Sequence, residues 1–255
     1  MAVTTVATGR SQGLLRYAPA LAAALAVVAL LLLAAAPVGW RAGWWHYRVS
    51  LLTLLPYAAY CGIAASAFGA LTLVAGRSRL GTRGIVLSAV AIVLGLAVFY
   101  GPWTFSQKRQ SVPPIHDITT DFADPPAYKA VMPARQAENA NTTTYDAKIA
   151  EQQRQAYPAV QPATLPVPAA DAFKRALAVA QSQGWTIVRS DPSAGEIEAS
   201  QSSFWFGFTD DVSIRVRPDG SGSRVDMRSL ARQGRSDFGV NAARIERFMT
   251  ALKAG

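Results

Sequence analysis

Residues 17–40 read YAPALAAALAVVALLLLAAAPVGW, a run of 24 residues without a charged side chain. Two further uncharged runs follow it, at residues 49–76 and 84–107. A hydrocarbon core about 30 Å thick requires about 20 mostly apolar residues, because a helix rises 1.5 Å per residue. All three runs are long enough, so the sequence predicts three membrane-spanning helices, at about residues 18–39, 50–75 and 84–104.

The charged residues divide unevenly between this apolar block and the rest of the chain. The chain has 25 Lys and Arg against 16 Asp and Glu, and all 16 acidic residues lie after Gln107. With 18 basic residues in the same region, the part after the spans is almost neutral. The remaining basic residues lie beside the spans, where Lys and Arg contact lipid headgroups. We therefore expect a lipid bilayer as partner and no nucleic acid.

The loops of the block predict its orientation. Arg77, Arg79 and Arg83 concentrate in the short loop between the second and third spans. Because Lys and Arg are more frequent on the cytoplasmic side of membranes, this loop is expected inside. An N-terminal tail and the three spans make up residues 1–107. Because the third span follows the cytoplasmic loop, the C-terminal part of the chain is expected on the extracytoplasmic side.

The soluble part, residues 108–255, begins with a proline-rich lead-in at residues 108–168. Proline disfavours a helix interior and favours extended or turn backbone. Within the lead-in, a helical stretch is expected at about residues 145–157. The compact part of the domain begins near Pro168.

The pattern after Pro168 predicts a helix, four antiparallel strands and a second helix. The last two strands alternate apolar and polar residues on both sides of a Pro-Asp-Gly turn, which is typical of a hairpin. Apolar residues at helical spacing follow Asp237. We therefore expect an α+β fold, with a roughly four-stranded antiparallel sheet covered by two helices. The expected strands lie at about residues 185–189, 196–200, 212–217 and 224–228.

A polar cluster running from the last strand into the last helix is the strongest candidate site. Free N–H groups at a helix N-terminus attract anions, and arginines strengthen that attraction. One hypothesis is a pocket for a phosphate, sulfate, carboxylate or lipid headgroup. Alternatively, Arg228 and Arg244 pair with Asp226, Asp237 and Glu246 and hold the last helix on the sheet. The candidate binding residues are Arg228, Arg232, Arg235, Ser236, Asp237, Asn241 and Arg244.

Residues 204–208 read FWFGF and place aromatic side chains on both faces of an expected strand. Trp205 and its neighbours are expected to fill the core between layers. The alternatives are a grip on acyl chains or sugars and docking on the bilayer surface.

Few residues have the types and spacing that catalysis or metal binding requires. His116, Asp117 and Asp121 offer an imidazole and carboxylates, but there is no His-x-x-x-His spacing, so no metal is expected. The single cysteine, Cys61, lies within a span. The sequence also lacks a Gly-x-Ser-x-Gly elbow, a P-loop and a dinucleotide fingerprint, so no cofactor is expected.

Several motifs resemble, in order, a known bacterial family. They include VPPIHDITTD at 112–121, FGFTDD at 206–211 and RSDFGVNAARI at 235–245. Residues 108–252 are similar to the bacterial domain of unknown function family 1499. This resemblance implies an inner-membrane protein facing the periplasm. It also marks seven recurring motif positions, namely His116, Asp117, Asp121, Arg235, Asp237, Asn241 and Arg244. It implies no catalytic residue, because no activity is established for the family.

These observations favour a non-enzymatic envelope protein that binds an anionic small molecule, a lipid headgroup or a partner protein. The alternative is a hydrolase or transferase acting on envelope lipid or polysaccharide, with His116 and nearby carboxylates as its acid–base groups.

Overall fold

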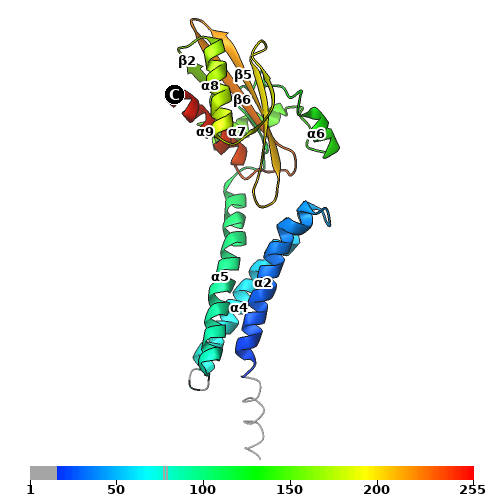
Figure 1. Ribbon diagram of the computed structural model, residues 1–255, viewed down its shortest axis with the longest axis vertical. Helices are drawn as coiled ribbons and strands as arrows, with labels where there is room; N and C mark the ends of the chain where they lie inside the picture. The colour runs from blue at the N-terminus through cyan, green and yellow to red at the C-terminus, as the bar shows by residue number, and fades with distance from the viewer. Residues whose placement is uncertain (1–15, 77, 79) are drawn as a thin grey trace, which may run out of the picture. The chain divides into compact units, whose positions relative to one another are not determined.

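The computed structural model describes residues 16–76, 78 and 80–255 (Figure 1). The expected N-terminal tail, and Arg77 and Arg79 of the basic loop, lie outside the described residues. The chain forms two compact units, one ending at Gln107 and the other extending from Lys108 to Gly255.

Three long apolar helices form most of the described part of the first unit, as predicted, and the third ends four residues beyond it. They are α2 (Ala18–Arg41), α4 (Leu55–Gly76) and α5 (Thr82–Ser111), and α4 is preceded by α3 (Tyr47–Val49) and a π-helical turn (Ser50–Leu54). All three are long and apolar enough to cross a membrane. Helix α5 continues beyond its predicted end because Gln, Lys and Arg are good helix formers and prolong the helix after the apolar run ends.

Small residues set the packing between α4 and α5. Gly62, Ser66 and Gly69 are buried, as expected for helices that approach closely. A Cβ atom added at Gly62 would lie 2.6 Å from the carbonyl oxygen of Gly95. Ser66 Oγ also donates a hydrogen bond to the carbonyl oxygen of Ile92 at 3.0 Å. The two backbones are therefore in direct contact at these positions.

The second unit contains a fully antiparallel sheet of six strands, so the predicted number of four is wrong. The strand order is β1-β6-β5-β4-β3, and β2 also pairs with β6. The two additional strands come from the lead-in and have only three residues each, which is too short for an alternating pattern to be recognised. The strands are β1 (Asp117–Thr119), β2 (Ala163–Leu165), β3 (Thr186–Asp191), β4 (Glu196–Ser202), β5 (Thr209–Asp219) and β6 (Gly222–Ala231).

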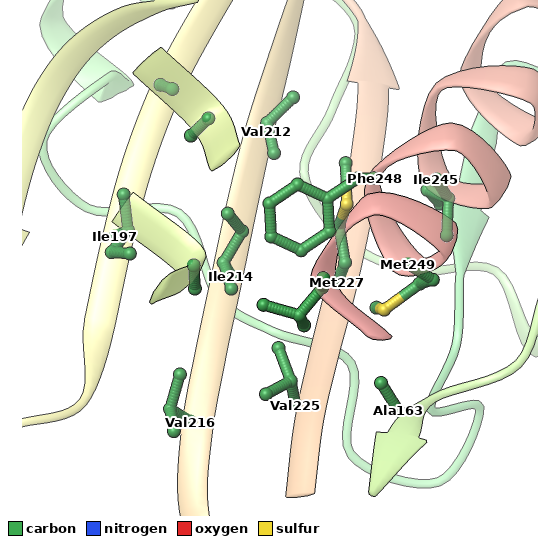
Figure 2. Close-up of a cluster of buried hydrophobic side chains, with 14 of the residues drawn as sticks. Ala163, Ile197, Val212, Ile214, Val216, Val225, Met227, Ile245, Phe248 and Met249 are labelled. Atoms are coloured by element: carbon green, nitrogen blue, oxygen red, sulfur yellow. The ribbon is translucent and has the colours of Figure 1, made fainter. Parts of the chain in front are cut away.

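Two helices cover one face of this sheet, as predicted: α8 (Ala169–Ser182) and α9 (Val240–Ala254) (Figure 1). The apolar core lies between the helices and the strands. Figure 2 shows Phe248 of α9 against Val212 and Ile214 of β5 and Met227 of β6. Trp185 stacks on Phe248 with ring centroids 5.4 Å apart.

The lead-in crosses the opposite face of the sheet. On that face it forms α6 (Met132–Ala137). The 3₁₀ turn (Ala147–Ile149) and α7 (Ala150–Ala156), which account for the helical stretch expected in the lead-in, lie beside β1, where Ile149 packs against the main core and the Gln153 side chain bonds to the backbone of Thr119. Tyr128 and Val131 pack against Leu230 of β6. Because successive residues of a strand point to opposite faces, every second side chain of β5 and β6 faces this segment. The sheet therefore has two long helices on one side and a mostly irregular segment on the other.

Candidate functional site

Arg228 lies on the face covered by the lead-in and is fully engaged by its neighbours. Its Nε and Nη2 atoms donate to the two carboxylate oxygens of Asp117 at 2.9 and 2.7 Å, and Nη2 also donates to Thr143 O at 2.8 Å. The rings of Tyr128 and Tyr145 lie 5.1 and 5.5 Å from the guanidinium carbon. Burial acts to lower the pKa of Arg228, but the hydrogen bond and charge of Asp117 outweigh it, and the pKa is raised. Arg228 is therefore a buried brace.

Arg232 belongs to a second buried cluster, centred on Asp211. The Arg232 guanidinium donates to both oxygens of this carboxylate at 2.9 and 2.8 Å and to Glu138 at 2.5 Å. Arg135 and Ser200 donate to Asp211 as well, each at 2.6 Å. Burial acts to raise the pKa of Asp211, but the hydrogen bonds from Arg232, Ser200 and Arg135 dominate and lower it. This carboxylate already occupies the position that an anionic ligand of Arg232 would need.

Arg244 projects from α9 onto the helical face of the sheet. It donates to Asp210 at 2.7 Å, to Gln201 at 2.9 Å and to Ser229 at 2.9 Å, and it also contacts the side-chain oxygen of Asn241. Burial raises the pKa of Asp210, although the charge and hydrogen bond of Arg244 oppose this shift. The arrangement ties α9 to β4, β5 and β6.

Arg228 and Arg244 both form buried ion pairs, but only Arg244 holds the last helix on the sheet as the alternative predicted, because Arg228 binds β1 and the lead-in on the opposite face. They pair with Asp117 and Asp210, whereas Asp226 pairs with Arg224. The partners expected from the sequence are wrong because proximity along the chain does not decide which strand and loop are adjacent in the sheet.

Asp237 accepts hydrogen bonds from free backbone N–H groups at the N-terminus of α9. One carboxylate oxygen accepts from the backbone N–H of Gly239 at 2.8 Å and the other from that of Asn241 at 2.9 Å. Ser236 Oγ accepts from the backbone N–H of Phe238 at 3.2 Å. Burial raises the pKa of Asp237, and the two backbone hydrogen bonds oppose this shift. The protein's own carboxylate thus stands where a bound anion was expected.

Arg235 is the exception among the candidate arginines, because its side chain is exposed. In the described part of the chain, no hydrogen bond or ion pair of its guanidinium is found. Its carbonyl oxygen lies 3.3 Å from Nδ1 of half-buried His116. Arg235 is therefore available to an external anion.

The structure does not bring His116 and the nearby carboxylates into one cluster. Asp117 is engaged by Arg228, and Asp121 by Arg215 at 3.0 Å. Among the described residues, no group of three His, Cys, Asp or Glu side chains is placed to hold a metal ion.

The prediction that Trp205 fills the core is wrong. Residues 203–208 form a turn between β4 and β5, closed by a hydrogen bond from Ser203 N to Phe208 O at 2.8 Å. Gly207 adopts a φ of +67°, which interrupts the strand. Phe204 is 83% exposed and Trp205 is 71% exposed. Aromatic residues are frequent in strands, so the aromatic composition of residues 204–208 led to the wrong prediction of a strand.

Glu198 of β4 anchors the lead-in to the sheet, and the sequence pattern did not reveal this role. Its carboxylate, almost fully buried, accepts hydrogen bonds from three consecutive backbone N–H groups, those of Lys129, Ala130 and Val131, at 2.9, 2.9 and 3.2 Å. An acidic residue in an alternating strand normally indicates a solvent-facing position. Only the lead-in covering this face makes Glu198 an internal capping group.

The chain thus combines three apolar helices long enough to cross a membrane with an α+β unit braced by internal ion pairs, an arrangement compatible with a membrane anchor and an appended domain. The model of a family described as "Protein of unknown function (DUF1499)" matches residues 117–252, from the first strand into the last helix. The chain belongs to this family, as the resemblance of its motifs indicated. A search of curated proteins finds no match.

Proposed function

We propose that this protein is a non-enzymatic, multi-pass protein of the bacterial inner membrane. In this proposal, the C-terminal domain lies on the periplasmic side and binds an anionic partner of the cell envelope through the exposed surface around Arg235. The observation that supports this proposal is the difference in burial among the candidate arginines. Arg228, Arg232 and Arg244 are buried against carboxylates, whereas Arg235 is exposed. An external anion can reach Arg235 without displacing an internal ion pair.

The same contacts argue against the hydrolase or transferase alternative. A general base must be able to accept a proton from a bound substrate. Asp117 and Asp121 are each bonded to an arginine, so neither is available to assist His116. We expect His116→Ala to leave ligand binding and the cellular phenotype unchanged; loss of both would favour the enzymatic alternative.

Native mass spectrometry of the full chain, released from lipid nanodiscs, tests the binding surface. An additional mass on the wild-type chain should be lost in Arg235→Ala and kept in Arg247→Ala, which removes an exposed arginine from α9. Equal retention in both variants would contradict the role of Arg235. Arg232→Ala is a poorer test, because it leaves Asp211 buried with fewer partners.

Cysteine labelling in intact cells tests the orientation. In a Cys61→Ala background, Ser221→Cys lies on an exposed hairpin, and Arg83→Cys lies exposed in the first turn of α5, next to the basic loop. A membrane-impermeant maleimide should label residue 221 directly and residue 83 only after permeabilisation. The reverse pattern would place the domain in the cytoplasm.

A further inference from the structure

We infer that the loop formed by residues 203–208, here called the aromatic tip, docks on the bilayer that the apolar helices cross. Phe204 and Trp205 enter its headgroup layer. The inference names an anionic lipid surface as the envelope partner and therefore rests on the proposed function.

The aromatic tip is built to present its two outermost rings to the surroundings. Its base is closed by two hydrogen bonds between Ser203 and Phe208, from Ser203 N to Phe208 O and from Phe208 N to Ser203 Oγ, at 2.8 and 3.0 Å. Phe204 and Trp205 pack edge to face, with centroids 5.4 Å apart, and remain mostly exposed. Trp favours the headgroup level because its ring is apolar while its N–H group can remain hydrated. The rings of Phe204 and Trp205 are therefore more stable in a headgroup layer than in water.

The aromatic tip projects from the same end of the sheet at which the chain enters the domain. Ala231 N donates to His116 O at 3.0 Å, just before β1. The next residue of the chain, Arg232, donates its N–H to Thr209 O at 2.9 Å, just after the tip. The β5–β6 hairpin, which contains Ser221, lies at the other end of these strands.

A short tether joins this end of the sheet to the last apolar helix. Only residues 112–116 lie between Ser111, the last residue of α5, and β1. Five extended residues reach at most about 18 Å at roughly 3.6 Å per residue. The chain therefore enters the sheet at its tip end, and a tether of this length allows that end to reach a bilayer surface.

The charges at the tip end are compatible with anionic lipid. Arg235 is exposed there, and Lys108 and Arg109 are exposed at the end of α5. The neighbouring carboxylates of Asp210 and Asp211 are buried against arginines, so they present little negative charge. Basic side chains near a bilayer are attracted by its negative surface potential.

Fluorescence quenching in the full chain tests the inference. In a Cys61→Ala background, an environment-sensitive fluorophore is placed at Ser202→Cys, next to the tip, or at Ser221→Cys, on the distant hairpin. Both positions are exposed. The chains are reconstituted in nanodiscs of phosphatidylglycerol and phosphatidylethanolamine that contain lipids with a headgroup-level spin-label quencher.

We expect severalfold stronger quenching at residue 202 than at residue 221. Combining Phe204→Ser with Trp205→Ser should reduce the quenching at residue 202 to the level at residue 221. Both side chains are mostly exposed, so the two substitutions remove little buried surface.

Equal quenching at the two positions, or quenching at residue 202 that survives the double substitution, would overturn the inference. The aromatic tip would then be assigned to a protein partner. Because a nanodisc exposes both bilayer faces, this result is independent of cellular orientation. Failure of docking would leave the labelling and mass measurements on Arg235 unaffected.

Discussion

Arg228 and Asp117 are 111 positions apart in the sequence, yet they form a two-point ion pair in the domain interior, at 2.9 and 2.7 Å. Asp117 is the first residue of β1, and Arg228 lies in β6. The pair therefore fastens the start of the domain to its central hairpin.

Removing one member of this pair should strongly destabilise the domain. Asp117→Ala leaves a buried guanidinium without its counter-charge, which typically costs about 3–5 kcal/mol. Urea denaturation of the nanodisc-embedded chain, followed by circular dichroism, measures the effect. Asp171→Ala is the control, because its ion pair with Lys174 is exposed and worth at most about 1 kcal/mol. Equal losses in the two variants would show that the Arg228 pair is not a brace.

Glu198 should control the order of the lead-in more than the integrity of the sheet. Glu198→Ala leaves three backbone N–H groups, at residues 129–131, without their acceptor. Each buried unsatisfied group costs about 1–3 kcal/mol, so the segment should open locally. Hydrogen exchange should accelerate at residues 129–131, with less change in β5. Unchanged exchange at these amides would contradict the capping role.

Asp211 and Asp237 should give the pH dependence of stability opposite slopes. The pKa of Asp211 lies below the ordinary 3.8, so its stabilisation is present above 3.8 and is lost as pH falls through the lowered value. The pKa of Asp237 is raised, so its contribution is complete below 3.8 and is lost as pH rises through the raised value.

Urea titrations across the acid range measure these slopes. Asp211→Asn should remove part of the acid-side loss of stability, and Asp237→Asn should remove part of the decline above 3.8. Both variants also lower overall stability, so the slope with pH is the diagnostic quantity. Identical slope changes in both variants would refute the assignment.

The close contact between α4 and α5 predicts a sharp position effect along one helix. A Cβ at Gly95 would collide with Gly62 O and Ser66 Oγ, whereas a Cβ at Gly101 meets nothing within 4 Å. Gly95→Leu should destabilise the helical unit by about 1–3 kcal/mol, the usual cost of overpacking, and Gly101→Leu should not. Aggregation temperature in mild detergent distinguishes the two. Similar aggregation temperatures for the two variants would contradict the close contact between α4 and α5 at Gly95.

The features that could be predicted from the sequence are those that repeat locally. The uncharged runs predicted the three long helices, and the alternation around the Pro-Asp-Gly turn predicted the β5–β6 hairpin. Both signals depend on the hydrophobicity of neighbouring residues, which needs no knowledge of distant contacts. The motifs also indicated the family, whose model matches residues 117–252.

The candidate site depended on contacts that no local pattern contains. The sequence placed Arg228, Arg232 and Arg244 in one cluster with Arg235, but the folded chain turns the first three inward and leaves Arg235 exposed. The partners Asp117 and Asp211 reach them only through the pairing of β6 with β1 and β5.

Sequence alone therefore determined the apolar helices, the order of the main strands and the residue types at the candidate site. Tertiary structure alone decided which arginines are neutralised, that the lead-in covers the second face of the sheet, and that Phe204 and Trp205 are exposed. The physical reason is that apolar periodicity is a property of neighbouring residues, whereas the burial and pairing of a charge depend on strand register across the whole domain.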